Sequence, residues 1–437
     1  MRPRAPRDQT LSAGGTQPVS SLLKRRERVL GPTYQAFYDE PLHLVRGEGV
    51  WLYDPSGNAY LDVYNNVASV GHCHPHVVAA LARQASMLNT HTRYLNELII
   101  DYGERLLATC PTIDGHALFT CTGSEANDLA IQIAQSATGG SGIIVTEFAY
   151  HGSTWLTAEL SPEDGGAWKA GIRNRTVKAP DTFTNEGEGA AHFAFYVQAA
   201  IDDLHAHGLK PAALLIDLAF SSDGIYFPPP EVLREAAAAI HKAGGLLIAD
   251  EVQSGLGRLG HAMWGFQRAM LDPDIVTMGK PVGDGHPIGA VIARQDLVRK
   301  FARQTKYFNT FGGNAVSAAV GMAVLDVLEN EGLVENSRIV GAYLKSALKQ
   351  LQQKHGLIGD VRGEGLYLGL ELIRPDRSMA PATTEAGALM NRLRQRGVLV
   401  GCTGPHGNIL KLRPPLVFSA ANADRLVTAI DEILSKW

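Results

Sequence analysis

The sequence predicts an α/β protein with a large domain around a mostly parallel sheet and a smaller α+β domain. Short apolar runs alternate with helical patterns from about residue 116 to 293, as in strands joined by crossover helices that cover both faces of a sheet. After Lys280 the pattern changes to long amphipathic helices. The length of 437 residues also favours two or three domains over one.

Composition excludes several classes of protein. Hydrophobic residues make up 45% of the chain and charged residues 19%, with a net charge of −4, which is ordinary for a soluble enzyme. We expect no nucleic-acid partner, because no broad basic field is present, and no membrane span, because no apolar run is long enough. The four cysteines lack metal or disulfide spacing, so they indicate reduced thiols in a cytoplasmic protein. His72 and His74 flank Cys73, but no further ligand set has zinc spacing, and we expect no metal.

The N-terminal part is expected to hold a tail and a segment that packs with the small domain. Residues 1–20 are rich in Arg, Pro, Gly, Ser and Thr and predict a disordered tail. Within 21–75, a short helix is expected over Ser21–Val29. A hairpin follows, because Val50–Tyr53 and Ala59–Val63 flank a turn with Pro, Gly and Asn. Pro75 is placed to begin the next helix.

The large domain is assigned to residues 76–311. Its strands are expected at 117–120, 143–145, 212–216, 246–249, 275–278 and 289–293. Helices are expected to begin near Ser124 and at Pro230, and the Gly-rich stretch between the strands at 143 and 212 is expected to be irregular. Residues 153–195 within it are expected to shape the substrate entrance.

The small domain is assigned to residues 312–437. Amphipathic helices are expected over Ala315–Leu328, Leu333–Lys354, Glu385–Arg396 and Asn422–Ser435, with a strand near Leu366–Leu372.

Asp250 and Lys280 are the first candidate catalytic residues. Each follows a buried-type strand, and ligands of open α/β sheets bind outside those ends. Pyridoxal phosphate (PLP) suits this pair: Lys280 would form the Schiff base, and Asp250 would hold the pyridinium nitrogen protonated. Each residue alone also fits a solvated loop or a helix cap, so the rest of the chain has to decide.

Three further motifs add weight to a PLP site. Gly123 and Ser124 lie between a strand and a helix, where backbone N–H groups can cradle an anion or Ser124 can simply cap the helix. Tyr150 could stack on a flat ring or belong to the core. Thr310 lies in a Gly-rich turn, where its hydroxyl could reach a phosphate or cap the next helix.

These motifs in this order resemble the class III aminotransferase family of PLP enzymes, fold type I, from about Leu22 to the C-terminus. The matching stretches are Gly-Ser-Glu-Ala-Asn at 123–127, Tyr-His-Gly at 150–152, Asp-Glu-Val-Gln at 250–253, Gly-Lys-Pro at 279–281 and Asn-Thr-Phe-Gly-Gly-Asn at 309–314. The resemblance implies a large domain with a sheet of the seven-stranded type.

The resemblance also implies roles for single residues. Lys280 would be the Schiff-base lysine and Asp250 the ring-nitrogen partner, Val252 would pack on the ring face opposite Tyr150, and Gln253 would contact O3′. Gly123 and Ser124 would hold the cofactor phosphate. Thr310 would reach the phosphate of the neighbouring subunit, which implies a homodimer with shared active sites, or a tetramer built from such dimers.

Two departures bear on the reaction. Family members that transaminate 4-aminobutyrate or ornithine carry a Glu where this chain has Ser222 and an Arg where it has Lys411. The exchange of Arg for Lys is not conservative, because Arg binds a carboxylate as a bidentate fork. Arg413 lies two residues on and would share a strand face with Lys411.

Four stretches resemble the phospholyase branch of the same family more narrowly. They are Asn65–Ala68, His91–Leu95, Pro281–Pro287 and Gly404–Lys411. The branch includes enzymes that act on O-phosphoethanolamine and 5-phosphohydroxylysine. Because a pocket for a dianionic leaving group needs cationic or N–H donors, Arg93, Lys411 and Arg413 are candidate substrate residues, together with Asn65. A surface or packing role suits each of them as well.

We therefore expect a PLP-dependent lyase that eliminates phosphate and ammonia from a small phosphorylated amine and leaves an aldehyde. The alternative is a class III ω-amino acid or amine aminotransferase that uses pyruvate or a similar ketoacid. A lyase for a hydroxylated aminophosphonate is a third reading. A non-catalytic PLP-domain regulator is disfavoured, because the N-terminal part is too short for a DNA-binding domain and Lys280 and Asp250 are both present.

Overall fold

The computed structural model describes residues 18–165, 171–183, 188–376 and 378–437. The predicted tail, residues 1–20, lies almost entirely outside these residues.

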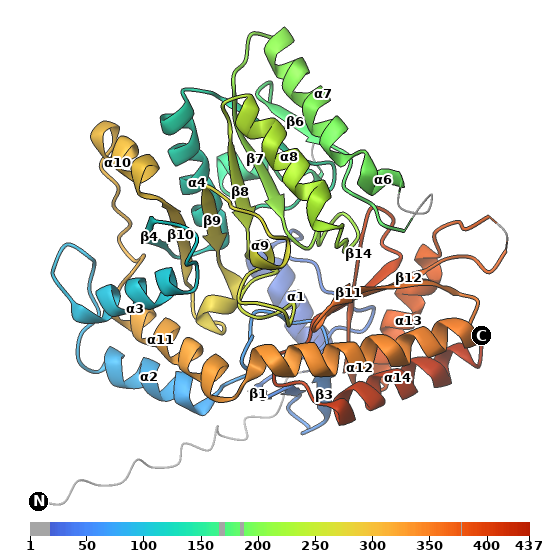
Figure 1. Ribbon diagram of the computed structural model, residues 1–437. Helices are drawn as coiled ribbons and strands as arrows, with labels where there is room; N and C mark the ends of the chain where they lie inside the picture. The colour runs from blue at the N-terminus through green and yellow to red at the C-terminus, as the bar shows by residue number, and fades with distance from the viewer. Residues whose placement is uncertain (1–17, 166–170, 184–187, 377) are drawn as a thin grey trace, which may run out of the picture.

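The centre of the molecule is a seven-stranded, mostly parallel sheet (Figure 1). In spatial order its strands are β4 (Gly115–Thr120), β10 (Gly289–Arg294), β9 (Ile275–Met278), β8 (Leu246–Asp250), β7 (Pro211–Asp217), β5 (Gly142–Thr146) and β6 (Asn174–Val177). β10 runs antiparallel to both of its neighbours, and the other pairs are parallel. The predicted α/β class with a mostly parallel sheet is confirmed.

Helices cover both faces of this sheet because its strands are apolar on both sides. In β7, Leu214 and Ile216 belong to one core cluster, and Leu215 belongs to the other. The first cluster contains residues of α7 (Phe193–Ala206) and α8 (Pro230–Lys242), and the second contains residues of α4 (Gly123–Thr138) and α10 (Gln295–Gln304). This alternation is the period of a strand buried on both faces.

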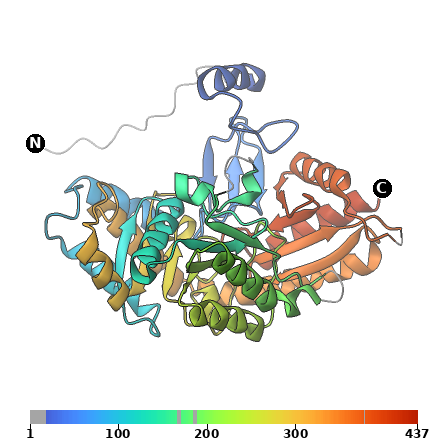
Figure 2. The ribbon, with the colours of Figure 1, turned by 90° about the horizontal axis from the view of Figure 1, so that it is seen from above.

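Two smaller sheets complete the fold. β1 (Arg46–Glu48), β2 (Trp51–Tyr53) and β3 (Ala59–Asp62) form an antiparallel meander, and β13 (Val398–Leu399) joins β3 in parallel. The other sheet is antiparallel, with β11 (Ile358–Glu364), β12 (Tyr367–Leu372), β15 (Ile409–Leu412) and β14 (Gly401–Thr403) in that order. The N-terminal meander therefore shares a sheet with a C-terminal strand, and Figure 2 shows it between the two halves of the molecule. The domain limits at 75 and 311 stay a prediction.

The remaining helices flank these sheets. They are α1 (Val19–Leu30), α2 (Pro75–Ala85), α3 (Glu97–Ala108), α5 (Trp155–Ala158), α6 (Glu188–Ala191), α9 (Gly265–Arg268), α11 (Ala315–Asn330), α12 (Leu333–Lys354), α13 (Thr383–Gln395) and α14 (Ala420–Leu434). α1 has no buried residue and stands apart from the body of the molecule (Figure 2). The expected starts of α2 at Pro75, α8 at Pro230 and α12 at Leu333 are confirmed.

The prediction of an irregular stretch between β5 and β7 was wrong in part. It contains the edge strand β6 and the helix α7. α7 buries Phe193, Val197, Ile201 and Leu204, which is the spacing of an amphipathic helix. The glycines at 187 and 189, just ahead of this pattern, favoured a loop reading. The helices α3 and α10 and the strand β11 were also missed.

Candidate functional site

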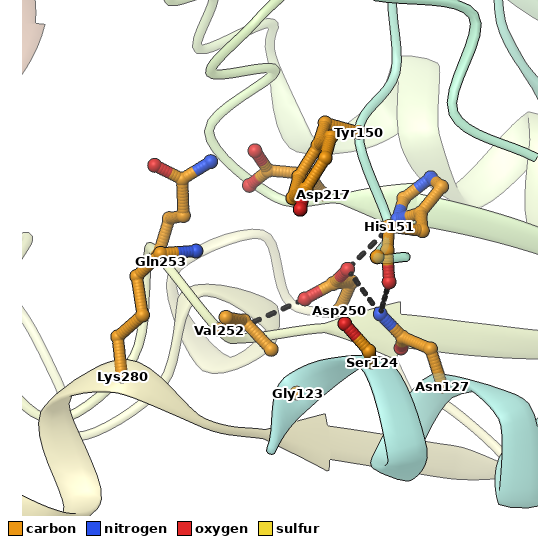
Figure 3. A pocket seen from close by; sticks show the side chains of 11 residues that line it. Gly123, Ser124, Asn127, Tyr150, His151, Asp217, Asp250, Val252, Gln253 and Lys280 are labelled. Carbon is orange, nitrogen blue, oxygen red and sulfur yellow. Dashed lines mark hydrogen bonds and ion pairs between the residues drawn. The ribbon is translucent and has the colours of Figure 1, made fainter. Parts of the chain in front are cut away.

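A cavity opens at the carboxyl ends of β7 and β8 and at the N-terminus of α4 (Figure 3). Its lining residues are Gly123, Ser124, Asn127, Tyr150, His151, Gly152, Asp217, Asp250, Val252, Gln253 and Lys280. The structure thus brings together seven of the predicted site residues, from Gly123 to Lys280. This is the edge at which ligands bind in open α/β sheets.

Three groups contact the side chain of Asp250. Its Oδ2 accepts hydrogen bonds from Asn127 Nδ2 at 2.8 Å and lies 2.7 Å from His151 Nδ1. Its Oδ1 accepts from the Val252 N–H at 3.0 Å. The side chain is buried, and these contacts fix its orientation at the cavity. One lone pair of Oδ1 remains for a group inside the cavity.

Asn127 and His151 are functional candidates to which sequence reasoning assigned no role. Asn127 also donates to the His151 carbonyl at 2.8 Å and accepts from Thr277 Oγ1 at 2.6 Å. It therefore ties α4, β9 and the loop after β5 to one carboxylate. Both residues stand inside the motifs at 123–127 and 150–152, so the motifs marked them, but only the fold shows that they point at Asp250.

The glycines at the cavity leave room that a side chain would fill. A Cβ on Gly123 would lie 2.8 Å from Val252 Cγ2, and a Cβ on Gly152 would lie 2.5 Å from Ser124 Oγ. α4 begins here, with the Thr122 side chain as N-cap. Gly123 and Ser124, in the first turn of the helix, line the cavity, and the N-terminus of a helix suits an anionic group. In Figure 3, Tyr150 lies above the Asp250 carboxylate and Val252 to its left.

Lys280 begins the short 3-10 helix η4 (Lys280–Gly283), directly after β9 and Gly279. Its side chain reaches into the cavity toward Gln253 (Figure 3). Burial lowers the pKa of Lys280, and the positive charge of Arg413 lowers it further. The carboxylates of Asp250, Asp217 and Glu163 act in the opposite direction and raise it. A lowered pKa favours the neutral amine, which is the form that acts as nucleophile and base.

Lys411 and Arg413 form a buried cationic pair near Lys280. Lys411 is 6% exposed and Arg413 is 5% exposed. Burial lowers the pKa of Lys411 to about 7, with Arg413 as the next cause. Arg413 donates to the Gln253 side-chain carbonyl, which also accepts from the Tyr367 hydroxyl at 3.3 Å. The Arg413 guanidinium lies over the Tyr64 ring, 4.8 Å from its centroid.

Ser222 is buried and has a partner that the sequence did not indicate. Its hydroxyl donates to Glu163 Oε2 at 2.5 Å. Glu163 belongs to a short 3-10 helix, η1 (Pro162–Asp164), in the stretch after Tyr150. The two residues are 59 positions apart, and no spacing rule connects them.

Five predicted residues do not line this cavity in the single chain: Lys411 and Arg413, described above, and Thr310, Arg93 and Asn65. Thr310 is exposed in the turn before α11. The Arg93 guanidinium lies over the Phe308 ring, 3.9 Å from its centroid. Asn65 lines a different cavity, near the N-terminal meander, and its side chain accepts from the Val67 N–H at 3.0 Å.

Comparison with known proteins identifies the family of this chain. Residues 34–434 match the model of the family described as aminotransferase class-III. The chain belongs to the class III aminotransferase family. It therefore belongs to a family of PLP-dependent enzymes, and its seven-stranded sheet matches the structures of that family.

The most similar class III relatives include both lyases and aminotransferases. The chain is 37% identical over 452 residues to an ethanolamine-phosphate phospho-lyase homolog from Caenorhabditis elegans, covering 98% of this chain and 96% of the relative. It is 39% identical over 427 residues to an alanine–glyoxylate aminotransferase 2 homolog from Arabidopsis thaliana, covering 95% and 87%. Among solved structures, an Arthrobacter phospholyase in complex with phosphoethanolamine matches with a TM-score of 0.92 and 41% identity, over 95% of this chain and 100% of that one.

Among the residues that the structure describes, no helix is long and apolar enough to cross a membrane. Within the same residues, no group of three or more His, Cys, Asp or Glu side chains could hold a metal ion. His72 instead bonds Asp62, and His74 bonds Glu331.

Proposed function

We propose that this class III enzyme binds PLP in the cavity at Lys280 and eliminates phosphate and ammonia from a small phosphorylated amine such as O-phosphoethanolamine. The observation that carries the proposal is the buried pair Lys411 and Arg413 close to Lys280. In the described part of the chain, neither of the two takes part in an ion pair. Buried cations without anions are costly unless a ligand supplies the charge, and a phosphate dianion does so.

The residues around the cavity fit the parts of PLP. Gly123 and Ser124 at the N-terminus of α4 suit its phosphate, and the free lone pair of Asp250 suits its ring nitrogen. Val252 and Tyr150 suit the two faces of its ring, and Lys280 suits its aldehyde. Thr310 would meet the phosphate of a second subunit, so the proposal includes a homodimer.

The proposed reaction divides the work between Lys280 and the cationic pair. Bound PLP supplies an electron sink for the charge left when the carbon that bears nitrogen loses its proton. The neutral amine of Lys280 takes that proton as general base. Lys411 and Arg413 hold the phosphate group, so that the neighbouring C–O bond breaks and its electron pair leaves with phosphate. One water is consumed, and ammonia and an aldehyde are released.

The first test supplies the PLP-loaded protein with O-phosphoethanolamine and no ketoacid, and measures inorganic phosphate and acetaldehyde. We expect multiple turnovers with the two products in equal amounts. Lys411→Met/Arg413→Met should lose most of this activity while the visible absorbance of bound PLP stays. Failure of the wild-type protein to release phosphate from O-phosphoethanolamine and from 5-phosphohydroxylysine would reject the lyase.

A class III aminotransferase is the second candidate, favoured by the 39% identity to the alanine–glyoxylate aminotransferase 2 homolog. Its test adds pyruvate or glyoxylate and an amine donor to the PLP-loaded protein, without any phosphorylated compound. Formation of alanine or glycine at a rate above the phosphate release of the first test would support it. In that case Lys411, which stands where some aminotransferases of the family carry Arg, would indicate a different amino-group acceptor and not a different reaction.

A further inference from the structure

Glu163 is a carboxylate at the cationic pair that the proposed reaction does not use. Its Oε2 accepts a hydrogen bond from the Ser222 hydroxyl at 2.5 Å. Ser222 is 6% exposed, whereas Glu163 is exposed at the surface of the single chain. The buried hydroxyl of Ser222 is thus hydrogen-bonded to the carboxylate of an exposed residue, Glu163.

Hydrogen bonds link the segment of Glu163 to the loop of Tyr150 on one side and, through the loop of Ser222, to the sheet that contains Lys411 on the other. Its N–H donates to the Ala149 carbonyl at 3.2 Å, one residue before Tyr150. Ser161, two residues earlier, accepts from the His151 N–H at 2.9 Å. On the other side, Thr403 of β14 donates to the Ser221 carbonyl at 3.0 Å and ties the loop of Ser222 to the small sheet.

The charge of Glu163 acts on the amines of the site. It acts to raise the pKa of both Lys411 and Lys280, against the lowering effect of burial. Among the described residues, however, no ion pair joins Glu163 to either amine, and the one hydrogen-bond partner of its side chain is Ser222. Glu163 is therefore near enough to offset the positive charge of the pair without being bound to it.

We propose that Glu163 is a movable counter-ion of the substrate pocket. In the empty enzyme its carboxylate, held by Ser222, offsets the charge of Lys411 and Arg413, and the phosphate group of a substrate takes over this task. The proposal rests on the proposed function, because it assigns the pair to an anionic substrate group. Its benefit to the enzyme is release: after elimination, the carboxylate competes with the product phosphate for the same two cations.

The physical reason lies in the number of like charges that meet here. Lys280, Lys411 and Arg413 repel one another in a buried site, and Asp217 and Glu163 are the carboxylates whose charge supports Lys411. Asp217 is fixed by its own bonds to the N–H groups of Ala219 and Ser221. Glu163, on a surface segment with one side-chain bond, is the carboxylate free to move.

The test measures anion affinity of the PLP-loaded protein by titration calorimetry. Sulfate is the probe for pH profiles, because it stays a dianion where phosphate groups titrate near pH 6. In wild type, sulfate affinity should fall as pH rises through about 7, where Lys411 loses its proton. Glu163→Gln should bind sulfate and inorganic phosphate roughly three- to tenfold more tightly at pH 6, because a repelling charge is removed.

In the same variant, the loss of sulfate affinity should occur at a lower pH than in wild type, because Lys411 loses a supporting carboxylate. Ser222→Ala should change affinity in the same direction by a smaller factor, because it frees Glu163 without removing its charge. Glu159→Gln is the matched control, because it removes one negative charge from the same segment. Glu159 contacts Asn174 and not Ser222. This variant should leave unchanged both the sulfate affinity and the pH at which that affinity is lost.

The outcomes separate the inference from the proposed function. If wild type binds phosphate and Glu163→Gln leaves affinity and pH profile unchanged, the counter-ion is rejected and the lyase stands. If Glu163→Gln weakens binding at every pH while its melting temperature falls, Glu163 has a packing role and the inference is rejected. If wild type binds neither phosphate nor sulfate, the proposed function and the inference fail together. In turnover, the inference requires that product phosphate inhibits Glu163→Gln more strongly than wild type.

Discussion

Lys411→Met should stabilise the protein, and most strongly at low pH. Burial lowers the pKa of Lys411 from 10.5 to about 7. Below pH 7 the folded protein therefore holds a buried charge at a cost of about 5 kcal/mol relative to the unfolded chain. Methionine has a similar length and no charge. Apolar replacement of a buried charge typically recovers roughly 1–4 kcal/mol.

The sign of the pH dependence follows from proton counts. Between pH 7 and 10.5 the unfolded chain keeps the Lys411 proton and the folded protein does not, so wild-type stability rises with pH over this window. The Met variant lacks this contribution. Its advantage over wild type should be largest near pH 6 and should shrink toward pH 10.

The assay compares melting temperatures of the PLP-loaded proteins at pH 6 and 9.5 in buffers without phosphate or sulfate, since an anion at the site would mask the cost. Lys242→Met, at an exposed position near the end of α8, is the control and should stay within about 0.5 kcal/mol of wild type. The reasoning would be refuted if Lys411→Met were less stable than wild type at pH 6. It would also be refuted if the gain in stability over wild type were the same at pH 6 and pH 9.5.

Three further predictions concern the cofactor cavity. Lys280→Ala should lose the visible absorbance of bound PLP, and a purified variant that keeps it would make the lysine assignment wrong. Gly123→Ala should weaken PLP binding at least tenfold in a titration of the apoprotein, because its Cβ would meet Val252 Cγ2 at 2.8 Å; unchanged affinity would show that the two segments separate freely. Asn127→Leu removes one of the three donors to Asp250 and should cost about 1–3 kcal/mol of stability, measured by urea unfolding; a neutral effect would mean that water replaces the amide.

Much of the fold was predictable because its elements carry local signals. The parallel strands are continuous apolar runs, and α8 and α12 begin at the residues expected for them. Asp250 and Lys280 could be placed on one edge because each directly follows such a run. What failed was the stretch between β5 and β7, where glycines precede α7 and the edge strand β6 is short.

The contacts that complete the site could not be predicted in the same way. Asn127 meets Asp250 across 123 positions, and Arg413 meets Gln253 across 160. Such pairs depend on the order of strands in the sheet and on how the small sheet packs against the large one. Periodicity reports which face of an element is buried, but not which distant polar group it meets there.

Ser222 shows how a departure from a family pattern acquires a meaning only in three dimensions. Read along the chain, it is the loss of a carboxylate from the substrate pocket. In the fold, Glu163 brings a carboxylate to the Ser222 hydroxyl from a different segment. A carboxylate on the strand-end loop would be fixed by the large sheet, as Asp217 is. On the counter-ion proposal, Glu163 leaves the Ser222 hydroxyl when an anion binds. The exchange would then replace a fixed charge by one that a dianionic leaving group displaces, which is what the proposed phosphate release requires.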